Sequence, residues 1–361
     1  MFFETMKHLE LFSGIGGFRR AMDLVGRDLG CLISTIGYSE IDAKAIATYQ
    51  ANYDTNKELQ IGDIVLFTSD EEKIKSLPDF DLLSGGFPCQ TFSSMGEQAG
   101  FNEDRGQMFF RIMDIVNVKR PRYILLENVK NLVNHDRGRT MTRIIMELEG
   151  AGYIVHHDVF NTSDFGLPQT RNRTIIFARL EEAGEFSFAA ELVKNVFDQM
   201  NRQESSLYFF NSTLDILAEK VSEKYYLSER IKPTILADGS AKFKANSEID
   251  KPIARPLTAS MHKMHRACQD NYYSDLFIQS KGDQRPCTWM SKEELAQIPI
   301  RKLTPYEAFL LQGFPASFVD RSRAAGVSDG ALYKQAGNAV SVNVIYAVLY
   351  YLIKSNIIRP R

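Results

Sequence analysis

The first 180 residues alternate short apolar runs with segments of helical spacing, and this alternation constrains the fold more than any other feature. The apolar runs predict strands over residues 8–12, 32–38, 80–84, 123–126, 154–160 and 174–178. Strands separated by helical segments of ten or more residues require right-handed crossovers, which build a mostly parallel, doubly wound sheet. The sequence therefore predicts an α/β domain whose ligands bind beyond the carboxyl ends of the strands.

The pattern weakens after residue 180. Residues 185–300 mix short apolar runs with prolines and show no repeated strand-helix unit. A helix is expected to start at Thr304, a suitable N-cap before Pro305, and a last apolar helix over 340–353 is expected to pack on the first domain. We predict a first domain of residues 1–184 plus 334–361 and a smaller, irregular domain of residues 185–333.

The spacing of the cysteines and the hydropathy of the chain indicate the cellular compartment in which the protein works. The four cysteines are far apart and form no C-x-x-C pair, which argues against a disulfide scaffold or a zinc knuckle and for a reducing compartment. No apolar run reaches the roughly 18 residues of a membrane span, and the N-terminus lacks the layout of a signal peptide. We expect a cytoplasmic protein without a metal or a membrane contact.

Charge is distributed unevenly along a chain whose net charge is only -2. Residues 251–361 carry 15 Lys and Arg against 8 Asp and Glu, so the remainder carries 28 against 37. A basic C-terminal third suits a phosphate-binding face, although ordinary surface variation gives an imbalance of this size too.

Glycines follow the first predicted strand, where residues 12–18 read FSGIGGF. Closely spaced glycines before a helix let the backbone approach a ligand. Glu40 follows the second strand and suits a ribose, and Asp63 is able to accept from an adenine amino group. The spacing is not G-x-G-x-x-G and no phosphate-binding P-loop occurs, so an adenosine ligand without a pyrophosphate is favoured.

Three further positions suit catalysis. Cys89 lies just beyond a strand end in a Gly- and Pro-rich loop, where a thiol is able to act as a nucleophile, whereas most cysteines are buried packing residues. Glu127 ends a buried strand, a position that suits a proton donor or a simple helix-start carboxylate. Arg171 and Arg173 alternate at a strand start, so both guanidinium groups are expected on one face.

Taken in order, these segments resemble the cytosine-5 DNA methyltransferase family. The family's motifs are similar to residues 11–18 (LFSGIGGF), 87–90 (FPCQ), 127–129 (ENV), 169–173 (QTRNR), 301–315 and 333–340. The resemblance covers residues 9–179 and 301–345. Residues 185–300, where the family keeps its target-recognition region, match no signature.

The resemblance implies a DNA (cytosine-5-)-methyltransferase that uses S-adenosylmethionine, releases S-adenosylhomocysteine and acts on double-stranded DNA. Cys89 would add to carbon 6 of a cytosine flipped out of the duplex. Glu127 would protonate or hydrogen-bond ring nitrogen 3, and Arg173, with Arg171, would hold the carbonyl oxygen at position 2 and a phosphate. The implied cofactor residues are Phe12, Gly14, Gly16, Gly17, Phe18, Glu40, Ile41, Asp63, Ile64, Pro88, Asn338 and Val340.

DNA contacts are expected from two segments. Gln90, Ser93 and Ser94 lie on the loop after the implied nucleophile. Lys263 and Arg266 belong to residues 256–266, which interleave basic, hydroxyl and apolar side chains as a base- and phosphate-reading loop would.

Three alternatives stay open: cytosine-5 methylation of tRNA, a catalytically silent DNA-binding regulator, and a nicotinamide-dependent oxidoreductase, which the glycine spacing disfavours. A compact chain without extensions suits a prokaryotic or phage restriction-modification system. We therefore expect a monomer that protects a specific site from an endonuclease and is associated with the nucleoid.

Overall fold

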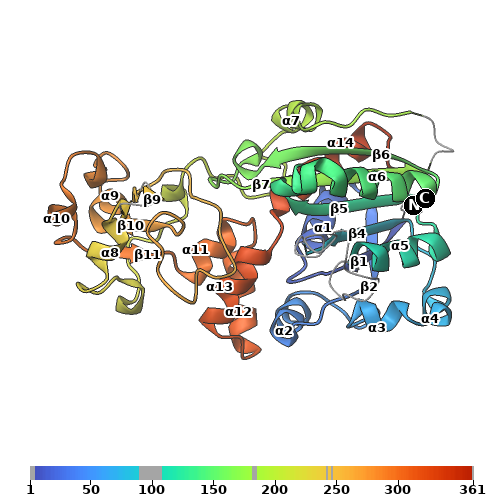
Figure 1. Ribbon diagram of the computed structural model, residues 1–361, viewed down its shortest axis with the longest axis horizontal. Helices are drawn as coiled ribbons and strands as arrows, with labels where there is room; N and C mark the ends of the chain where they lie inside the picture. Colours follow the sequence, from blue (N-terminus) through green and yellow to red (C-terminus); the bar gives the residue numbers. More distant parts are fainter. Residues whose placement is uncertain (1–4, 89–107, 181–184, 241–242, 245–246, 360–361) are drawn as a thin grey trace. The chain divides into compact units, whose positions relative to one another are not determined.

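The computed structural model describes residues 5–88, 108–180, 185–240, 243–244 and 247–359, and these form two compact units (Figure 1). Unit 1 comprises Met1–Asn161, Asn172–Ser206 and Val344–Arg361, and unit 2 comprises Thr162–Arg171 and Leu207–Asn343.

The units divide at positions other than the expected boundaries at 184/185 and 333/334. Residues 185–206 stay in unit 1, where the backbone N–H of Ala190 donates to a carboxylate oxygen of Asp158 at 2.8 Å. Residues 162–171 join unit 2, where the N–H of Thr170 donates to the carbonyl of Ala254 at 2.9 Å. The functional roles of the two predicted domains stay a prediction.

Unit 1 contains a seven-stranded sheet in the order β3-β2-β1-β4-β5-β7-β6. Neighbouring strands from β3 to β5 are parallel, and β7 is antiparallel to both β5 and β6. The predicted mostly parallel sheet is confirmed, although sequence reasoning missed the two-residue β3. The strands are β1 (Thr5–Leu11), β2 (Leu32–Tyr38), β3 (Leu59–Gln60), β4 (Leu82–Gly86), β5 (Tyr123–Val129), β6 (Tyr153–Asn161) and β7 (Asn172–Leu180).

The strand order places a switch point between β1 and β4. The chain first builds outward from β1 through β2 to β3 and then returns to add β4 on the other side of β1. In doubly wound sheets, ligands bind at such a switch point, beyond the carboxyl ends of the strands.

One face of the sheet packs against helices through an apolar core. Leu9, Leu83 and Ile124 from three adjacent strands are fully buried with Phe109 of α5 and Ile144 of α6. The helices of unit 1, which Figure 1 shows around the sheet, are α1 (Gly17–Leu29), α2 (Ala43–Asn52), α3 (Ile64–Thr68), α4 (Glu71–Ser76), α5 (Met108–Lys119), α6 (Arg139–Gly150), α7 (Ala190–Asp198) and most of α14 (Val342–Lys354).

The α14 helix belongs to the core rather than to a surface. A helical stretch over Asp329–Lys354 is long and apolar enough to cross a membrane, but 83% of its apolar window is buried inside the protein. Tyr346 of α14 donates its hydroxyl to a carboxylate oxygen of Asp28 on α1 at 2.7 Å, which places α14 beside α1.

Unit 2 is built from short elements. Its α11 begins as predicted: the Thr304 hydroxyl accepts from the N–H of Glu307, and Pro305 occupies the first turn. The helices are α8 (Lys232–Leu236), α9 (Asp275–Gln279), α10 (Lys292–Leu295), α11 (Pro305–Leu310), α12 (Ala316–Ala324) and α13 (Asp329–Asn338), and the strands pair as β8 (Gly239–Ser240) with β9 (Phe243–Lys244) and β10 (Tyr272–Ser274) with β11 (Ile300–Lys302).

Short 3-10 helices join these elements. They cover Lys130–Leu132 and His135–Gly138 in unit 1, and Thr162–Phe165, Thr213–Asp215, Glu223–Tyr225 and Pro286–Thr288 in unit 2.

Two ionisable side chains are buried completely in β1. His8 lies with its ring nitrogens 3.0 Å from the Thr35 hydroxyl of β2 and 2.7 Å from the Ser84 hydroxyl of β4. Burial, with a smaller effect of the Arg19 charge, lowers the pKa of His8 to about 3. Burial raises the pKa of Glu10 to about 8, although the Arg19 charge acts against this rise.

We expect the Glu10→Gln substitution to flatten the decline of stability with pH. Between about pH 7 and 8, folded Glu10 still holds at least about half of a proton that the unfolded chain has released, while His8 is largely neutral in both states. One such proton makes the free energy of unfolding fall by up to about 1.4 kcal/mol per pH unit. Urea unfolding at several pH values in this window measures the slope.

Exposed Glu72 on α4 provides the control, because Glu72→Gln leaves the buried carboxyl in place. Equal slopes for the wild type and Glu10→Gln would contradict the expected titration of Glu10.

Candidate active site

The turn after β1 adopts a backbone conformation that requires glycine. Gly16 is the N-cap of α1 with φ of 79°, in the left-handed region. A Cβ atom there would lie 2.4 Å from Cε2 of Tyr53, closer than any real contact. Because residue 16 has no side chain, the turn is able to pack directly against the ring of Tyr53.

Backbone and carboxylate hydrogen bonds tie this turn to the end of β2. The N–H of Ser13 donates to the carbonyl of Ser39 at 2.8 Å, and the N–H of Gly14 donates to Oε2 of Glu40 at 2.9 Å. Oε1 of Glu40 accepts from the N–H groups of Ile41 and Asp42 at 2.7 and 2.8 Å. Three backbone donors thus fix the Glu40 carboxylate at the carboxyl edge of the sheet.

The segment after β3 joins the same edge. The Ser39 hydroxyl donates to the carbonyl of Gly62 at 3.1 Å, and the next residue, Asp63, is exposed and caps α3 by accepting from the N–H of Val65. The sheet therefore brings Gly14, Glu40 and Asp63 together, as the parallel strands require.

The other expected cofactor residues are distributed differently. Within unit 1, Phe12 is half-buried, Ile41 is exposed by 74% and Pro88 is exposed, whereas Gly17, Phe18 and Ile64 are buried. The ring of Phe18, at 2% exposure, belongs to the core. Asn338 and Val340 lie in unit 2.

Glu127 and Arg173 form an ion pair on one face of the sheet. Register places Val129 of β5 opposite Arg173 of β7, so Glu127, two residues earlier, is the diagonal neighbour of Arg173. The Nε atom of Arg173 lies 2.8 Å from Oε1 of Glu127, with side chains exposed by 19% and 11%. The carboxylate therefore lies beside a fixed positive charge at the carboxyl end of β5.

The next residue on β5, Asn128, holds the last described residues before Cys89. The side-chain amide of Asn128 donates to the carbonyl of Phe87 at 2.9 Å, and the ring of Phe87 is buried with that of Phe109. The expected nucleophile Cys89 and the expected DNA contacts Gln90, Ser93 and Ser94 lie outside the described residues. The described part of the loop, as far as Pro88, is thus anchored beside Glu127.

Arg171 does not share the environment of Arg173, contrary to the expected common face. Its guanidinium donates to the carbonyls of Leu257, Gly337 and Ala339 at 2.9, 3.1 and 2.9 Å, and the side chain is 1% exposed. The strand alternation does not extend to Arg171, because β7 begins only at residue 172. This geometry indicates that Arg171 holds unit 2 together rather than contacting a substrate.

Gln169, to which sequence reasoning gave no role, completes the same anchor. Its side-chain amide donates to the carbonyl of Leu311 at 2.9 Å and accepts from the N–H of Leu257 at 2.9 Å. Gly337 on α13 packs directly on the same segment, because a Cβ there would lie 2.2 Å from the carbonyl carbon of Thr258. Gln169 and Gly337 lie in the motifs of residues 169–173 and 333–340, and this membership is the sequence signal that could have pointed to them.

Arg266 is also engaged within unit 2. Its guanidinium donates to Oδ1 of Asp270 at 2.9 Å and to the Thr258 hydroxyl, so it supports the loop instead of extending from it. Lys263, at the tip of the same loop, is exposed. Of the two residues expected to contact DNA here, Lys263 alone keeps an exposed position.

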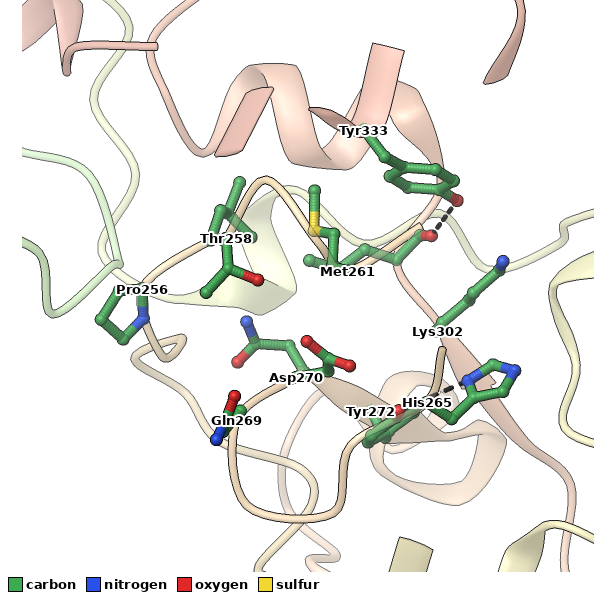
Figure 2. A pocket seen from close by; sticks show the side chains of 12 residues that line it. Pro256, Thr258, Met261, His265, Gln269, Asp270, Tyr272, Lys302 and Tyr333 are labelled. Carbon is green, nitrogen blue, oxygen red and sulfur yellow. Dashed lines mark hydrogen bonds between the residues drawn. The ribbon is translucent and has the colours of Figure 1, made fainter. Parts of the chain in front are cut away.

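A cavity behind this loop is too small for a base. Figure 2 shows Thr258, Met261, His265 and Tyr272 around it, and its volume is about 20 Å³. A space of this size holds about one water molecule. Among the residues that the structure describes, no three His, Cys, Asp or Glu side chains lie close enough to hold a metal ion.

Comparison with known proteins gives consistent results. The family described as C-5 cytosine-specific DNA methylase matches residues 6–354. Type II methyltransferase M.NlaX of Neisseria lactamica is 35% identical over 346 residues, covering 95% of this chain and 94% of that protein. Type II methyltransferase M.HpaII of Haemophilus parainfluenzae is 36% identical over 356 residues, covering 95% and 88%.

Solved structures extend the similarity to the fold. The S. pombe Dnmt2 methyltransferase aligns with a TM-score of 0.72 at 18% identity, covering 98% of this chain and 99% of that one. The Entamoeba histolytica methyltransferase EhMeth aligns with a TM-score of 0.71 at 21% identity, covering 98% and 99%.

We expect Gly337→Ala to destabilise the protein by about 2–3 kcal/mol, because the added Cβ would meet backbone atoms of residues 258 and 259, which cannot rotate away. Gly330→Ala on the same helix is the matched control, because the nearest atom to its Cβ, Cδ2 of His262, is 3.9 Å away. Alanine favours a helix, so this control should leave the free energy of unfolding unchanged or higher. Equal losses in urea unfolding of both variants would contradict the proposed contact.

Proposed function

The chain belongs to the C-5 cytosine-specific DNA methylase family and methylates carbon 5 of cytosine in DNA, and we propose that it does so through a transient covalent bond to Cys89. The observation that supports this mechanism best is the Glu127–Arg173 ion pair, next to the Asn128 amide that holds the start of the Cys89 loop. The arrangement brings a carboxyl group, a cation and an anchored loop to one edge of the sheet.

The proposed reaction starts at the cytosine ring. The Cys89 thiolate forms a bond to carbon 6, and Glu127 protonates or hydrogen-bonds ring nitrogen 3, so the electron pair moves to carbon 5. After carbon 5 is methylated, a solvent base takes its proton, the C5–H electron pair restores the double bond between carbons 5 and 6, and the bond from carbon 6 to the Cys89 sulfur breaks. Arg173 holds Glu127 in place and binds the carbonyl oxygen at position 2.

The turn after β1 is suited to the cofactor. The family uses S-adenosylmethionine, which supplies the methyl group when it is bound. Because Gly16 has no side chain, the Tyr53 ring packs directly against the turn, and the fixed Glu40 carboxylate is an acceptor suited to ribose hydroxyls. We assign Phe12, Gly14 and Ile41 to the same site and Asp63 to the adenine, whereas a cofactor role for Asn338 and Val340 stays a prediction from the sequence.

The proposed substrate is a specific site in double-stranded DNA. A ring inside a stacked duplex is inaccessible to a thiolate, so the target cytosine must be flipped out, which costs roughly a few kcal/mol. Exposed Lys263 is proposed to contact the DNA, and Arg266, through Asp270 and Thr258, to stiffen the loop that carries it. The relatives are named type II methyltransferases, so we propose protection of this site from an endonuclease, by a monomer in the cytoplasm.

Methyl transfer to duplex DNA should require Cys89. We expect Cys89→Ala to abolish incorporation of labelled methyl groups from S-adenosylmethionine, while the variant still binds the cofactor. Bisulfite sequencing of DNA from cells that express the wild type identifies the methylated site. Methylation by Cys89→Ala would refute the nucleophile, and activity on tRNA alone would refute the substrate.

Glu127→Gln should lower kcat by about a hundredfold or more, since proton transfer by a positioned side chain contributes about 10²–10⁴. Arg173→Lys should lower kcat less, because a lysine keeps the charge but loses the planar donor. Glu147→Gln on α6, which breaks the surface ion pair with Arg143, is the control and should leave kcat unchanged. Wild-type kcat in Glu127→Gln would exclude this carboxyl group from the reaction.

A further inference from the structure

Three tyrosine rings pack in a row, which we call the tyrosine stack, beside the turn that follows β1: Tyr38 is stacked on Tyr49, and Tyr53 is tilted against Tyr49. The ring centroids of Tyr38 and Tyr49 lie 4.3 Å apart, and those of Tyr49 and Tyr53 lie 4.7 Å apart. Tyr38 ends β2, Tyr49 lies on α2 and Tyr53 follows α2 directly. The stack therefore joins the segment after β2 to the start of α1, and the proposed mechanism gives it no role.

Tyr53 contacts Gly16 in two ways. Its hydroxyl donates to the carbonyl of Gly16 at 2.6 Å, and its ring occupies the space that a Cβ of residue 16 would fill. The same carbonyl accepts the first helical hydrogen bond of α1 from the N–H of Arg20 at 2.9 Å. The Tyr53 hydroxyl and the first turn of α1 thus together hold the Gly16 carbonyl, and the Tyr53 ring sets how closely the turn is packed.

A charged network holds Tyr53 in this position. The Arg19 guanidinium lies over the Tyr53 ring, 5.2 Å from its centroid, and forms ion pairs with Asp23 at 2.9 Å and with Glu58. Glu58 also accepts from the Tyr49 hydroxyl at 3.4 Å. Because Arg19 is bound on two sides, the ring beneath it has little freedom to move.

We propose that Tyr53 is a positioning residue for the cofactor, acting through the peptide bond between Gly16 and Gly17. A peptide is planar and trans, so its C=O and N–H point in opposite directions. Holding the carbonyl toward Tyr53 aims the N–H of Gly17 to the other side. This N–H belongs to the first turn of α1, where backbone donors suit an anionic group such as the carboxylate of the cofactor's amino-acid moiety.

This inference rests on the proposed function, because it assumes that the cofactor binds at this turn. A positioning role and a purely structural role predict different results. Loss of a structural hydrogen bond lowers the unfolding temperature alone. Loss of the positioning bond weakens cofactor binding and raises the cofactor KM, with kcat at saturating cofactor and the DNA KM unchanged.

The test uses the full chain carrying Tyr53→Phe, which removes the hydroxyl and keeps the ring. We expect the Kd for S-adenosylmethionine, measured by calorimetry, to rise about fivefold, as loss of one neutral hydrogen bond would produce. Tyr38→Phe is the matched control from the same stack, because its hydroxyl contacts the side chains of Gln50 and Gln60 instead of the turn. This control should bind the cofactor as the wild type does.

The outcomes separate this inference from the function on which it rests. Wild-type affinity in Tyr53→Phe, or equal weakening in Tyr53→Phe and Tyr38→Phe, would overturn the role of Tyr53 while methylation stands. A wild-type protein that neither binds S-adenosylmethionine nor methylates DNA would overturn the proposed function itself.

Discussion

Parallel pairing of β1 with β2 on one side and β4 on the other is the constraint on which the candidate site depends. In parallel strands all carboxyl ends meet at one edge, and the reversal of strand order at β1 keeps the connecting helices clear of it. The glycine turn, Glu40 and the start of the Cys89 loop follow β1, β2 and β4 in turn. Their proximity is therefore a consequence of topology, and side-chain hydrogen bonds refine it.

The antiparallel strand β7 places the first residues of a strand at the carboxyl edge of the sheet, where parallel strands place only their last residues. Because β7 runs against β5, its first residues lie beside the last residues of β5, and Arg173 reaches the carboxyl edge from the opposite chain direction. Largely buried carboxylates are costly to ionise, and a guanidinium 2.8 Å away offsets part of that cost. Removing Arg173 would take away the guanidinium that lies 2.8 Å from Glu127, so the two side chains are best regarded as one group.

Sequence patterns predicted those parts of the molecule that depend on local spacing. The strands of unit 1 other than β3, and the Thr304 cap, were anticipated because apolar periodicity and capping residues act over a few positions. The destinations of Arg171 and Arg266 were not. The partners of Arg171 lie 86 to 168 residues away in the chain, and no spacing rule reaches that far. Arg171 and Arg173 do not form one cluster, because β7 begins at residue 172. Arg171 therefore lies before the strand, where side chains do not alternate as they do within it, and Arg173 lies in the strand.

The short elements of unit 2 leave carbonyls that neither a strand ladder nor a helix satisfies, and arginine side chains bind several of them. Arginine fits this need, because its planar head carries five donors. Arg171 binds three carbonyls, and fully buried Arg301 binds the carbonyl of Ala218 together with both carboxylate oxygens of Glu307. Lysine in place of Arg171 would keep the charge but lack the planar set of donors that binds three carbonyls at once, so in this unit arginine serves as a structural element.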